Sequence, residues 1–323
     1  MRGRWVGWFV VLLLMAASLL LLDPARLGLS TAQPFAQLVA LRGSLALGAV
    51  LCAAALLFCV LLVRHRGESR PIRLFIAFVV LMLFAGANVG VLVARGVSAS
   101  TALPRDKAPG DIDILAFNTY YAIDGPAAIS ELVARHDADA VMLPETSRRD
   151  ALKIAGDDYA LFMSAGDPGA SAPTALLVAT SMGEYKRITG PDTEYGLVGA
   201  SPIDGDGPIL YAVHVVSPIP ARMSLWRDEL DLVMGICQET DDVIMAGDFN
   251  ATVDHAPLRD ASCVDGSVGS GAVGTWPGGM PALLGAPIDH VFADPAAWKP
   301  VASAIAAMPR SDHRALLVRL RSV

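Results

Sequence analysis

Three long apolar runs near the start of the chain constrain its fold more than any other feature. They cover about residues 5–22, 45–63 and 74–93 and are interrupted by little more than Gly, Ser and one Asn. Each is close to the roughly 20 residues that an α-helix needs to cross the hydrocarbon core of a bilayer. The sequence therefore predicts three transmembrane helices, with residues 1–97 as a membrane anchor and the bilayer as a partner.

The basic residues around these runs predict an orientation in the membrane. Arg2 and Arg4 precede the first run, and the basic segment 64–73 separates the second run from the third. The connection between the first two runs holds only Arg26 and Arg42. Because basic loops stay on the cytoplasmic side, we expect a multi-pass plasma-membrane protein whose C-terminal part is extracytoplasmic. A cleaved signal peptide in place of the first span would leave that part on the same side.

After the apolar runs we expect a linker, residues 98–110, and then a globular extracytoplasmic domain, residues 111–323. Within the domain 14 Lys and Arg oppose 29 Asp and Glu, a net charge of 14 − 29 = −15, whereas residues 1–110 carry 11 − 3 = +8. Proteins bind nucleic acid largely by neutralising its phosphates with Lys and Arg. The charge balance therefore argues against nucleic acid as a partner, and it is compatible with a divalent-metal site.

The hydrophobic pattern of the globular region is that of a mixed α/β protein. Helices are expected at residues 125–136 and 222–237, the first of them opened by a proline. Strands are expected at residues 111–119, 138–145, 174–180, 209–216, 241–249, 288–294 and 312–321.

Four cysteines occur in the chain. Cys52 and Cys59 lie in the second apolar run, where packing as small apolar side chains is the usual role. Cys237 and Cys263 are the only two in the globular region and can form a disulfide in an oxidising compartment. The sequence leaves the geometry that such a bond requires open.

Polar side chains recur where the expected strands begin or end. Singly, each has a structural explanation as a turn residue, a surface acid, a buried histidine or a cap. Asp248 and Asn250 lie two positions apart, so on a strand they would share a face. Together the set contains the acids, amides and histidines that reactions at phosphate require. Its members are Asn118, Glu145, His214, Asp248, Asn250, Asp289, Asp312 and His313.

The region 112–323 carries, in this order, the motifs FNTYY, LPET, YAVHVVSP, AGDFNAT, IDHVFA and SDHRALLV. The series resembles that of the endonuclease/exonuclease/phosphatase (DNase I-like) superfamily. Membrane spans followed by this domain, with GDFNATVDHAPLRD and GTWP, are similar to a bacterial branch that includes VanJ-like glycopeptide-resistance proteins. The resemblance implies a four-layer α/β sandwich of two mixed β-sheets with helices outside, and a site where the strand-end loops converge.

The resemblance also implies a metal site. It would contain Asn118, Glu145 and Asp312, with Glu145 as the principal ligand of Mg²⁺ or Mn²⁺. The chemistry calls for such residues independently, because in-line attack on a phosphoryl group needs a hard cation with oxygen ligands to neutralise developing negative charge.

The resemblance implies catalytic roles for five further residues. Asp248 would position or deprotonate the attacking water, and Asn250 would contact the phosphate. His313 would act at the scissile phosphate, oriented by Asp289, and His214 would be a second histidine on the phosphate. General-base and donor groups of these types are what a phosphoryl transfer asks for, and a carboxylate behind a histidine fixes its tautomer.

Two candidate substrate-binding residues also have structural explanations. Trp276, in GTWPGG, can stack on a substrate or anchor the Gly-rich loop. Arg148, followed by Arg149, can meet a second phosphate or be solvated, and we favour the solvated state. Trp226, inside the second expected helix, is expected to be a core residue.

Three functions are compatible with the sequence. We favour a membrane-anchored, Mg²⁺-dependent phosphoesterase that hydrolyses a phosphate ester or pyrophosphate bond of a membrane lipid or lipid-linked envelope precursor at the outer face of the membrane. The alternatives are an extracytoplasmic nuclease and a noncatalytic envelope or resistance factor that uses the fold for binding. The short stretch between Glu145 and His214 has few aromatic or basic residues, which argues against a grip on nucleic acid.

Overall fold

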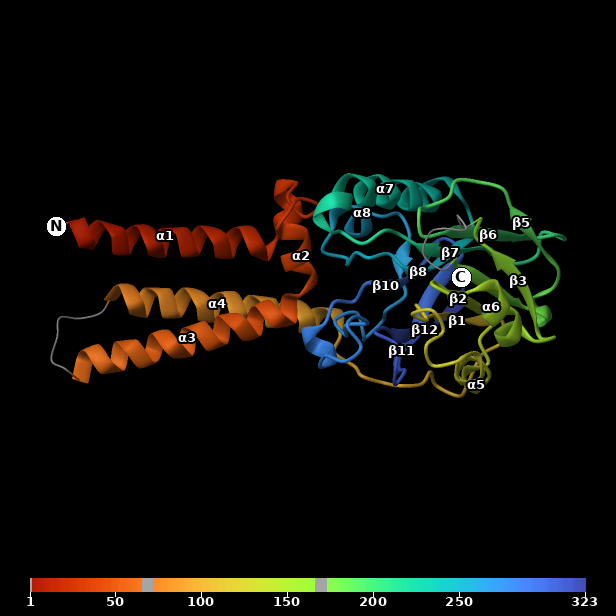
Figure 1. The fold of residues 1–323 in the computed structure, drawn as a ribbon, viewed down its shortest axis with the longest axis horizontal. Coiled ribbons are helices and arrows are strands. Elements are labelled where there is room, and N and C mark those ends of the chain that lie inside the picture. The colour runs from red at the N-terminus through yellow and green to blue at the C-terminus, as the bar shows by residue number, and fades with distance from the viewer. Residues whose placement is uncertain (1, 66–71, 166–172) are drawn as a thin grey trace. The chain divides into compact units, whose positions relative to one another are not determined.

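The structure, a computed structural model, describes residues 2–65, 72–165 and 173–323 (Figure 1). The chain divides into two compact units, Met1–Ala94 and Arg95–Val323. The basic segment 64–73, on which the predicted orientation depends, lies mostly outside the described residues.

The first unit contains three long helices at the apolar runs: α1 (Arg2–Leu22), α3 (Arg42–His65) and α4 (Ile72–Arg95). Each is long and apolar enough to cross a membrane. All three extend beyond the expected runs, since flanking arginines also favour helix. Two short helices, η1 (Pro24–Leu27) and α2 (Phe35–Ala40), lie between α1 and α3 and were not predicted.

A buried polar pair joins the long helices of this unit. Arg42 Nη1 donates to Asn88 Oδ1 at 3.0 Å, and Arg42 Nη2 donates to the carbonyl oxygen of Leu22 at 3.0 Å. Asn88 in turn donates to the carbonyl oxygen of Phe84 at 2.9 Å. Buried polar groups are tolerated only when they are hydrogen-bonded, so Arg42, which the sequence placed in a connecting loop, is an interior residue that links α1, α3 and α4.

The second unit contains two six-stranded mixed sheets. Their strand orders are β11-β12-β1-β2-β4-β3 and β5-β6-β7-β8-β10-β9. The strands are β1 (Asp111–Ala116), β2 (Ala140–Leu143), β3 (Tyr159–Met163), β4 (Ala175–Ala179), β5 (Tyr185–Ile188), β6 (Leu197–Pro202), β7 (Ile209–His214), β8 (Val243–Asp248), β9 (Val264–Asp265), β10 (Asp289–Ala293), β11 (Trp298–Ala307) and β12 (Arg314–Ser322).

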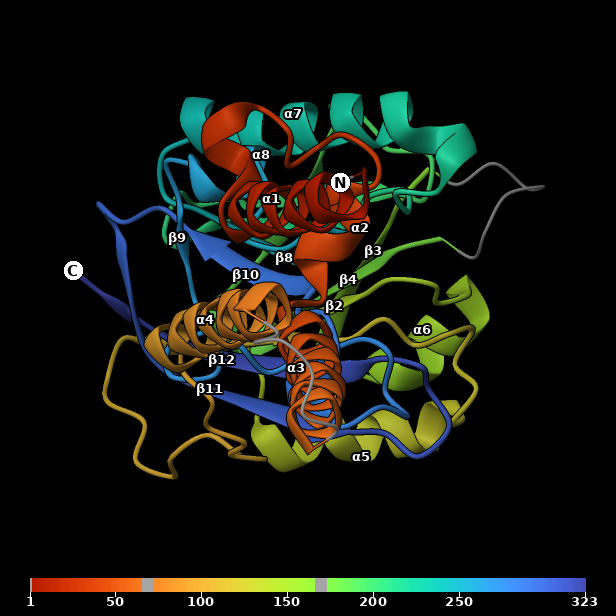
Figure 2. The ribbon, with the colours of Figure 1, turned by 90° about the vertical axis from the view of Figure 1, so that its left-hand side faces the viewer.

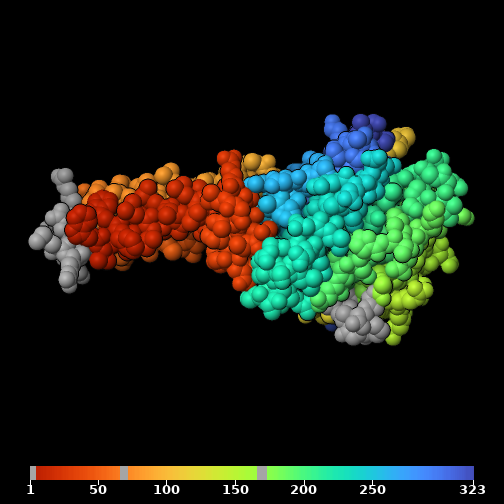
Figure 3. Space-filling model, turned by 90° about the horizontal axis from the view of Figure 1, so that it is seen from above, coloured from red at the N-terminus to blue at the C-terminus, as the bar shows by residue number. Residues whose placement is uncertain are grey.

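The sheets pack face to face with helices outside, which gives the predicted four-layer α/β sandwich. Side chains alternate along a strand, so Ile114 of β1 joins the cluster between the sheets while Leu115 joins the cluster under α5 (Pro126–His136) and α6 (Arg148–Ala155). Figure 2 shows α7 (Met223–Glu239) on the opposite side, above β8 and β10. Seen from above, α7 forms part of the outer surface of the unit (Figure 3).

Several elements of the second unit were not predicted from the sequence. They are α6, α8 (Ala256–Arg259), β3, β5, β6, β9 and β11. The longest of these, β11, has the sequence WKPVASAIAA, whose alanines show little strand preference. It forms because it pairs with β12 from Trp298↔Ser322 to Ala307↔Arg314, a long-range pairing that a local pattern does not reveal.

The segment expected to be a linker is hydrogen-bonded to the second unit. Ser98 N donates to the carbonyl oxygen of Gly269 at 2.8 Å, and Ile305 N donates to that of Ser100 at 2.8 Å. Lys107 Nζ pairs with Asp139 Oδ2 at 2.5 Å. These contacts attach residues 98–107 to the surface of the sandwich.

Cys237 and Cys263 form a disulfide, with their Cα atoms 5.7 Å apart. The bond joins the last turn of α7 to the residue before β9. It therefore fixes the C-terminal end of the helix to the edge of the second sheet. Trp226 of α7 is fully buried, as expected of a core residue.

A buried polar pair connects β10 to β9 and to the segment that follows β8. His290 is buried; its Nδ1 lies 2.8 Å from Asp265 Oδ2 and its Nε2 lies 3.0 Å from the carbonyl oxygen of Ala251. Burial alone would raise the pKa of Asp265 and lower that of His290, but the two groups stabilise each other's charged forms, so the pKa of Asp265 lies below 3.8 and that of His290 above 6.5.

We expect Asp265→Asn to lower the free energy of unfolding by about 1.5–3 kcal/mol, the range for a hydrogen bond to a charged group. Only 22% of the Asp265 side chain is exposed, so water screens the pair little. The Asp265 contribution is lost as pH falls through its lowered pKa, and the His290 contribution is lost as pH rises through its raised pKa. Thermal unfolding across pH should therefore show the largest difference from wild type between the two unfolded-state values, 3.8 and 6.5. A difference that is constant with pH would contradict this pairing.

Candidate active site

The strand ends that carry the polar residues meet at one end of the sandwich. β1 and β2 are parallel, as are β7 and β8, so their C-terminal ends lie together within each sheet. β12 is antiparallel to β1 and β10 is antiparallel to β8, which brings the N-terminal ends of β10 and β12 to the same place. The convergence expected of the strand-end loops is therefore present.

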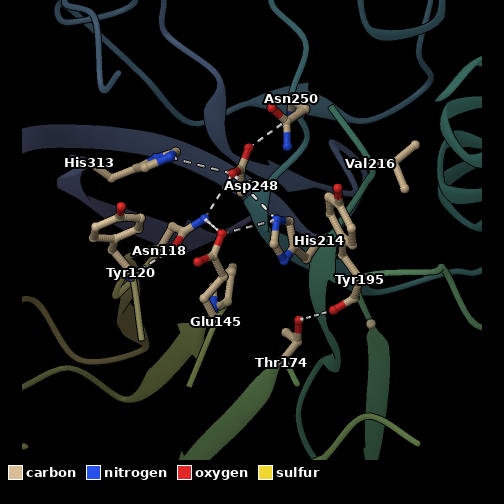
Figure 4. A network of polar contacts seen from close by, with 12 residues as sticks. Asn118, Tyr120, Glu145, Thr174, Tyr195, His214, Val216, Asp248, Asn250 and His313 are labelled. Carbon is tan, nitrogen blue, oxygen red and sulfur yellow. Dashed lines mark hydrogen bonds and ion pairs between the residues drawn. The ribbon is translucent and has the colours of Figure 1, made fainter. Parts of the chain in front are cut away.

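Asn118 bridges the two sheets at this end. Its Nδ2 donates to Glu145 Oε1 at 3.2 Å and to Asp248 Oδ2 at 3.0 Å (Figure 4). Its Oδ1 accepts a hydrogen bond from Tyr120 N at 3.1 Å, which sets the orientation of the amide. Two residues that follow β1 and β2 are thereby joined to the last residue of β8 in one cluster.

Two buried histidines flank the Asp248 carboxylate. The Nε2 atoms of His214 and His313 each lie 3.7 Å from Asp248 Oδ2, and His214 Nε2 also lies 3.9 Å from Glu145 Oε1. Both rings point toward Asp248 in Figure 4. Asp248 therefore sits between a histidine from β7 and one from the start of β12.

The environments of the two histidines favour opposite protonation states. Burial, together with the charge of His313, lowers the pKa of His214 to about 3. Burial would also lower the pKa of His313, but Asp289 and Asp248 outweigh it and raise the pKa to about 10. At neutral pH, His214 is therefore neutral and His313 is an imidazolium, a pairing that assigns distinct acid and base roles.

Asp289 orients His313. Its Oδ2 lies 2.8 Å from His313 Nδ1, so the other ring nitrogen, Nε2, faces Asp248. The backbone nitrogen of Asp289 donates to Thr275 Oγ1 at 3.1 Å. This carboxylate–histidine pair is the arrangement that fixes a histidine tautomer and stabilises its cation.

Glu145 and Asp248 carry the carboxylates at the centre of the cluster. Burial raises the pKa of Glu145, and it raises that of Asp248 to about 7 although His313 and the Asn118 amide oppose it. Glu145 adopts a left-handed conformation, φ 56°, and its carbonyl oxygen accepts from Thr119 Oγ1 at 2.9 Å. A strained backbone held in place by its neighbours is common at functional positions.

The donor set fits a divalent cation. The carboxylates of Glu145, Asp248, Asp289 and Asp312 face one imidazolium, so negative charge is in excess. Among the described residues, the buried side-chain atoms without a hydrogen-bond partner include Asp289 Oδ1, Asp312 Oδ1 and His214 Nδ1. Hard cations prefer such oxygen ligands.

Two sets of residues could hold the cation. Asp248, Asp289 and His313 have ligand atoms within 4.8 Å of one another. However, His313 Nδ1 is already bonded to Asp289, and a protonated ring cannot ligate a metal. The carboxylates of Glu145 and of Asp312, whose Oδ1 has no hydrogen-bond partner, are the better oxygen donors on chemical grounds.

Asn250 lies beside Asp248 but not on the same strand face. β8 ends at Asp248, and Asn250 has a left-handed conformation, φ 47°. Asn250 N donates to Asp248 Oδ1 at 2.8 Å, and its Nδ2 donates to the carbonyl oxygen of Val215 at 2.9 Å. The expected strand alternation is therefore wrong at this point, because a turn, and not the pleat, brings the two residues together.

Comparison with known proteins agrees with this geometry. The sequence model of the Endonuclease/Exonuclease/phosphatase family matches residues 115–313, a span that contains every residue of the cluster. The chain belongs to the endonuclease/exonuclease/phosphatase family. Members of this family are hydrolases of phosphate and phosphodiester bonds and commonly use divalent metals. No match to a curated protein was found.

Solved structures share the fold at low sequence identity. Humanized D. rerio TDP2 is 21% identical, with a TM-score of 0.52 over 66% of this chain and 99% of that one. D. rerio TDP2 complexed with single strand DNA product is 19% identical, with a TM-score of 0.52 over 65% and 99%. The human Nocturnin catalytic domain with bound sulfate anion is 13% identical, with a TM-score of 0.50 over 68% and 96%. These likenesses establish the fold of this family member.

The remaining predicted site residues differ in their relation to the cluster. Trp276 is 38% exposed, and its Nε1 donates to Asp312 Oδ2 at 3.3 Å, so it reaches the edge of the site. Asp312 directly precedes His313, and its charge contributes to raising the pKa of both Glu145 and His313. Arg148 is exposed at the start of α6, and no contact joins it to the cluster among the described residues.

Two residues that support the site were missed in the sequence. Arg314, directly after His313, is buried and donates to the carbonyl oxygens of Gly274 and Gly278, each at 2.7 Å. It thereby fixes the Gly-rich loop that carries Trp276. The alternating strand pattern around Arg314 gave no sign of this role.

Glu229 is the second missed residue. It is buried in α7, where its carboxylate accepts from Glu194 N at 2.7 Å and Val216 N at 2.8 Å. The first contact holds the segment whose Tyr195 ring packs 4.8 Å from the His214 ring. The second holds the backbone beside Val215, which accepts the Asn250 amide. In the sequence, Glu229 is one acid among several on an amphipathic helix, so no signal distinguished it.

We expect Glu229→Ala to lower kcat by about 10–100-fold, because misplacing reacting groups by about 1 Å costs up to that much. Glu229→Gln keeps one acceptor oxygen and should stay within about tenfold of wild type. The control is Glu239→Ala, an exposed acid on the same helix. Steady-state kinetics give kcat for each variant, and thermal unfolding shows whether each variant is folded. Equal losses of kcat in the Ala and Gln variants would contradict positioning through these two hydrogen bonds.

Proposed function

We propose that this family member is a membrane-anchored, divalent-metal-dependent phosphoesterase whose catalytic unit is extracytoplasmic. Its substrate would be a phosphate ester or pyrophosphate bond of a membrane lipid or lipid-linked envelope precursor. The observation that carries the proposal is the position of Asp248 between neutral His214 and the Asp289-bound imidazolium of His313.

The cluster supports hydrolysis with distinct roles for its residues. Asp248, with its pKa near neutrality, accepts a proton from the attacking water or holds that water in line. His313 presents Nε2–H, and its positive charge stabilises the negative charge that develops on the phosphoryl oxygens. His214 and Asn250 lie on the other side of Asp248 and are assigned contacts to the same group.

The assigned cation ligands are Glu145 and Asp312, with Asn118 orienting the Glu145 carboxylate through its amide. When bound, the cation supplies Lewis-acid stabilisation of charge on the phosphate. Mg²⁺ or Mn²⁺ suits an all-oxygen site.

Two observations support a membrane location with an extracytoplasmic catalytic unit. Three helices of the chain are long and apolar enough to span a bilayer. The Cys237–Cys263 disulfide belongs to the catalytic unit, and disulfides persist in oxidising, extracytoplasmic compartments. The same combination of spans and domain supports assignment to the VanJ-like branch.

The charge of the domain favours a lipid phosphate over nucleic acid. Residues 111–323 carry a net −15 by the count above, whereas nonspecific nucleic-acid binding depends on Lys and Arg at phosphates. Arg148, the basic residue that could have met a second phosphate, is exposed, and no contact joins it to the cluster within the part of the chain that the structure describes. A nuclease remains the alternative to test, since a structure of the same fold holds a single-strand DNA product.

The decisive experiment uses the full chain purified in nanodiscs. Release of phosphate or leaving group is measured with Mg²⁺, Mn²⁺ or EDTA on lipid monophosphates, lipid pyrophosphates, phosphodiester lipids, and single- and double-stranded DNA. We expect metal-dependent turnover of a phosphate-containing lipid that EDTA abolishes and His313→Ala loses. Turnover of DNA alone would replace the proposal with a nuclease, and no turnover of any substrate would favour a noncatalytic envelope or resistance factor.

A further inference from the structure

The tryptophans of the second unit differ in how far they are exposed. Trp226 is fully buried and Trp298 is 8% exposed, so both pack in the interior. Trp276, in the segment between β9 and β10, is 38% exposed. A tryptophan that only anchors a loop stabilises it by removing its large apolar ring from water. The exposure of Trp276 therefore indicates a role other than packing.

The indole N–H of Trp276 is directed at Asp312. Trp276 Nε1 donates to Asp312 Oδ2 at 3.3 Å. The other carboxylate oxygen, Asp312 Oδ1, is buried and has no hydrogen-bond partner in the described ranges of the chain. A buried carboxylate oxygen without a partner is costly, and hard divalent cations bind such oxygens. One oxygen of Asp312 is thus held by the protein while the other is left for a ligand.

Arg314 fixes the loop that carries Trp276, residues 274–286, which we call the Trp276 loop. The Arg314 guanidinium donates to the carbonyl oxygens of Gly274 and Gly278, each at 2.7 Å. Because the donors of a planar guanidinium have fixed directions, they constrain the loop more than one flexible contact would. Arg314 follows Asp312 by two positions, so the start of β12 holds both the carboxylate and the loop.

Backbone contacts bring the Trp276 loop against the segment before β12. Gly278 N donates to the carbonyl oxygen of Asp312 at 2.5 Å. A Cβ atom at position 278 would lie 2.9 Å from the carbonyl oxygen of Ser311, so a larger residue would push the two segments apart. The Trp276 backbone also exchanges hydrogen bonds of 3.0 Å and 2.7 Å with Ala286. The indole and the carboxylate therefore belong to one hydrogen-bonded framework.

The Trp276–Asp312 contact has a counterpart at the other assigned cation ligand. Asn118 Nδ2 donates to Glu145 Oε1 at 3.2 Å. Each assigned ligand thus has one carboxylate oxygen that accepts from a neutral N–H donor. Groups that hydrogen-bond to a metal ligand fix its orientation, and their removal typically weakens metal binding by about 10–100-fold.

Three roles of Trp276 respond differently to replacement by phenylalanine. Stacking on a substrate would depend on the ring face, and anchoring of the loop would depend on buried ring area. Only a role at Asp312 depends on the indole N–H. Phenylalanine keeps an aromatic face but has no hydrogen-bond donor, so Trp276→Phe isolates that role.

We propose that Trp276 is a positioning residue of the cation site. Its indole N–H holds Asp312 Oδ2, so that Asp312 Oδ1 is presented to the divalent cation. This role rests on the proposed function for the assignment of Asp312 as a ligand. It does not require the Trp276 ring to touch the substrate.

The test measures Mn²⁺ affinity in the absence of substrate, from the electron paramagnetic resonance signal of free Mn²⁺. It uses the full chain in phosphatidylcholine nanodiscs, because this lipid carries no net charge and competes little for the cation. The variants are Trp276→Phe, Asp312→Ala and the double variant. The matched control is Trp298→Phe, since Trp298 Nε1 donates to Asp242 Oδ1 at 2.6 Å. Asp242 precedes β8 and so lies at the end of the sheet opposite Asp248.

We expect Trp276→Phe to raise the Kd for Mn²⁺ by about tenfold, the lower end of the range for such groups, because the 3.3 Å bond is long. Trp298→Phe should leave the Kd within about twofold of wild type, as expected for a distant site. The double variant should have the same Kd as Asp312→Ala alone, because a residue that acts through another has no effect once the other is removed. Thermal unfolding shows whether each variant is folded.

An unchanged Kd in Trp276→Phe would overturn the positioning role. A Kd in the double variant that exceeds that of Asp312→Ala by the same factor would also overturn it, because Trp276 would then act independently of Asp312. If Trp276→Phe keeps the wild-type Kd while Trp276→Ala raises the KM for substrate, the ring contacts the substrate and the N–H has no role at the cation.

The binding measurement separates this role from the proposed function. Unchanged affinity in Trp276→Phe together with weaker binding in Asp312→Ala would overturn only the role of Trp276. Unchanged affinity in Asp312→Ala would remove Asp312 from the cation site and overturn the ligand assignment as well. Weaker binding in Trp276→Phe, in a protein that hydrolyses no phosphate ester, would support the positioning role and overturn the phosphoesterase.

Discussion

Replacing His313 by alanine is expected to lower turnover by about 10²–10⁴-fold, the range for loss of a general acid or of a charged donor in the transition state. The imidazolium is the positively charged side chain within the described cluster, and both Asp289 and Asp248 stabilise it. Its loss leaves the carboxylates without their counter-charge. The measurement is kcat with saturating Mg²⁺ on the substrate identified in the nanodisc panel.

A second variant, Asp289→Asn, tests whether His313 acts as a cation. The amide removes the charge that raises the pKa of His313, so the imidazolium should lose its proton at a lower pH than the value of about 10 in the wild type. The alkaline limb of the pH–rate profile should therefore move to lower pH. The variant should still fold, as judged by thermal unfolding. An unmoved alkaline limb would show that His313 does not act as a cation.

The second large effect is expected for Asp248→Asn, with a loss of turnover of about 10²–10⁴-fold. The side chain is nearly isosteric and its one amide oxygen can accept either from Asn118 Nδ2 or from Asn250 N, but it cannot accept a proton. The control is Asp260→Asn, which changes an acid whose side chain is 65% exposed. Both variants should fold, as judged by thermal unfolding.

The pH dependence sharpens this prediction. Burial raises the pKa of Asp248 to about 7, so in the absence of bound cation the carboxylate forms as pH rises through neutrality. Activity at limiting metal should therefore fall on the acid side of neutrality in the wild type, and the residual activity of Asp248→Asn should lack that acid limb. If Asp248→Asn keeps activity within tenfold of wild type, another group activates the water.

The sequence was sufficient for features that depend on composition or on short motifs. The three candidate spans follow from the length of the apolar runs, and the structure has helices there that are long and apolar enough to cross a membrane. The motifs around Asn118, Glu145, His214, Asp248 and His313 predicted the family and the end of the sandwich at which these residues meet. Strands flanked by turn residues were recovered because their hydrophobic pattern is local.

Other features depend on partners that are distant in the chain. The pairing of β11 with β12 overrides a weak local preference, and the turn at Asn250 replaces an expected strand alternation. Glu229 and Arg314 gained their roles from backbone groups 13 or more residues away. No local pattern distinguishes such residues from ordinary surface or strand residues.

By itself, the sequence determined which side chains this protein can use: apolar spans, an acidic domain, and a set of carboxylates, amides and histidines at strand ends. Only the tertiary structure decided the protonation state and the orientation of each side chain. His214 and His313 have the same chemistry in isolation, yet burial makes one neutral and a carboxylate behind the other makes it a cation. Protonation and orientation are set by the desolvation and neighbouring charges of each group, and those exist only once distant strands have packed together.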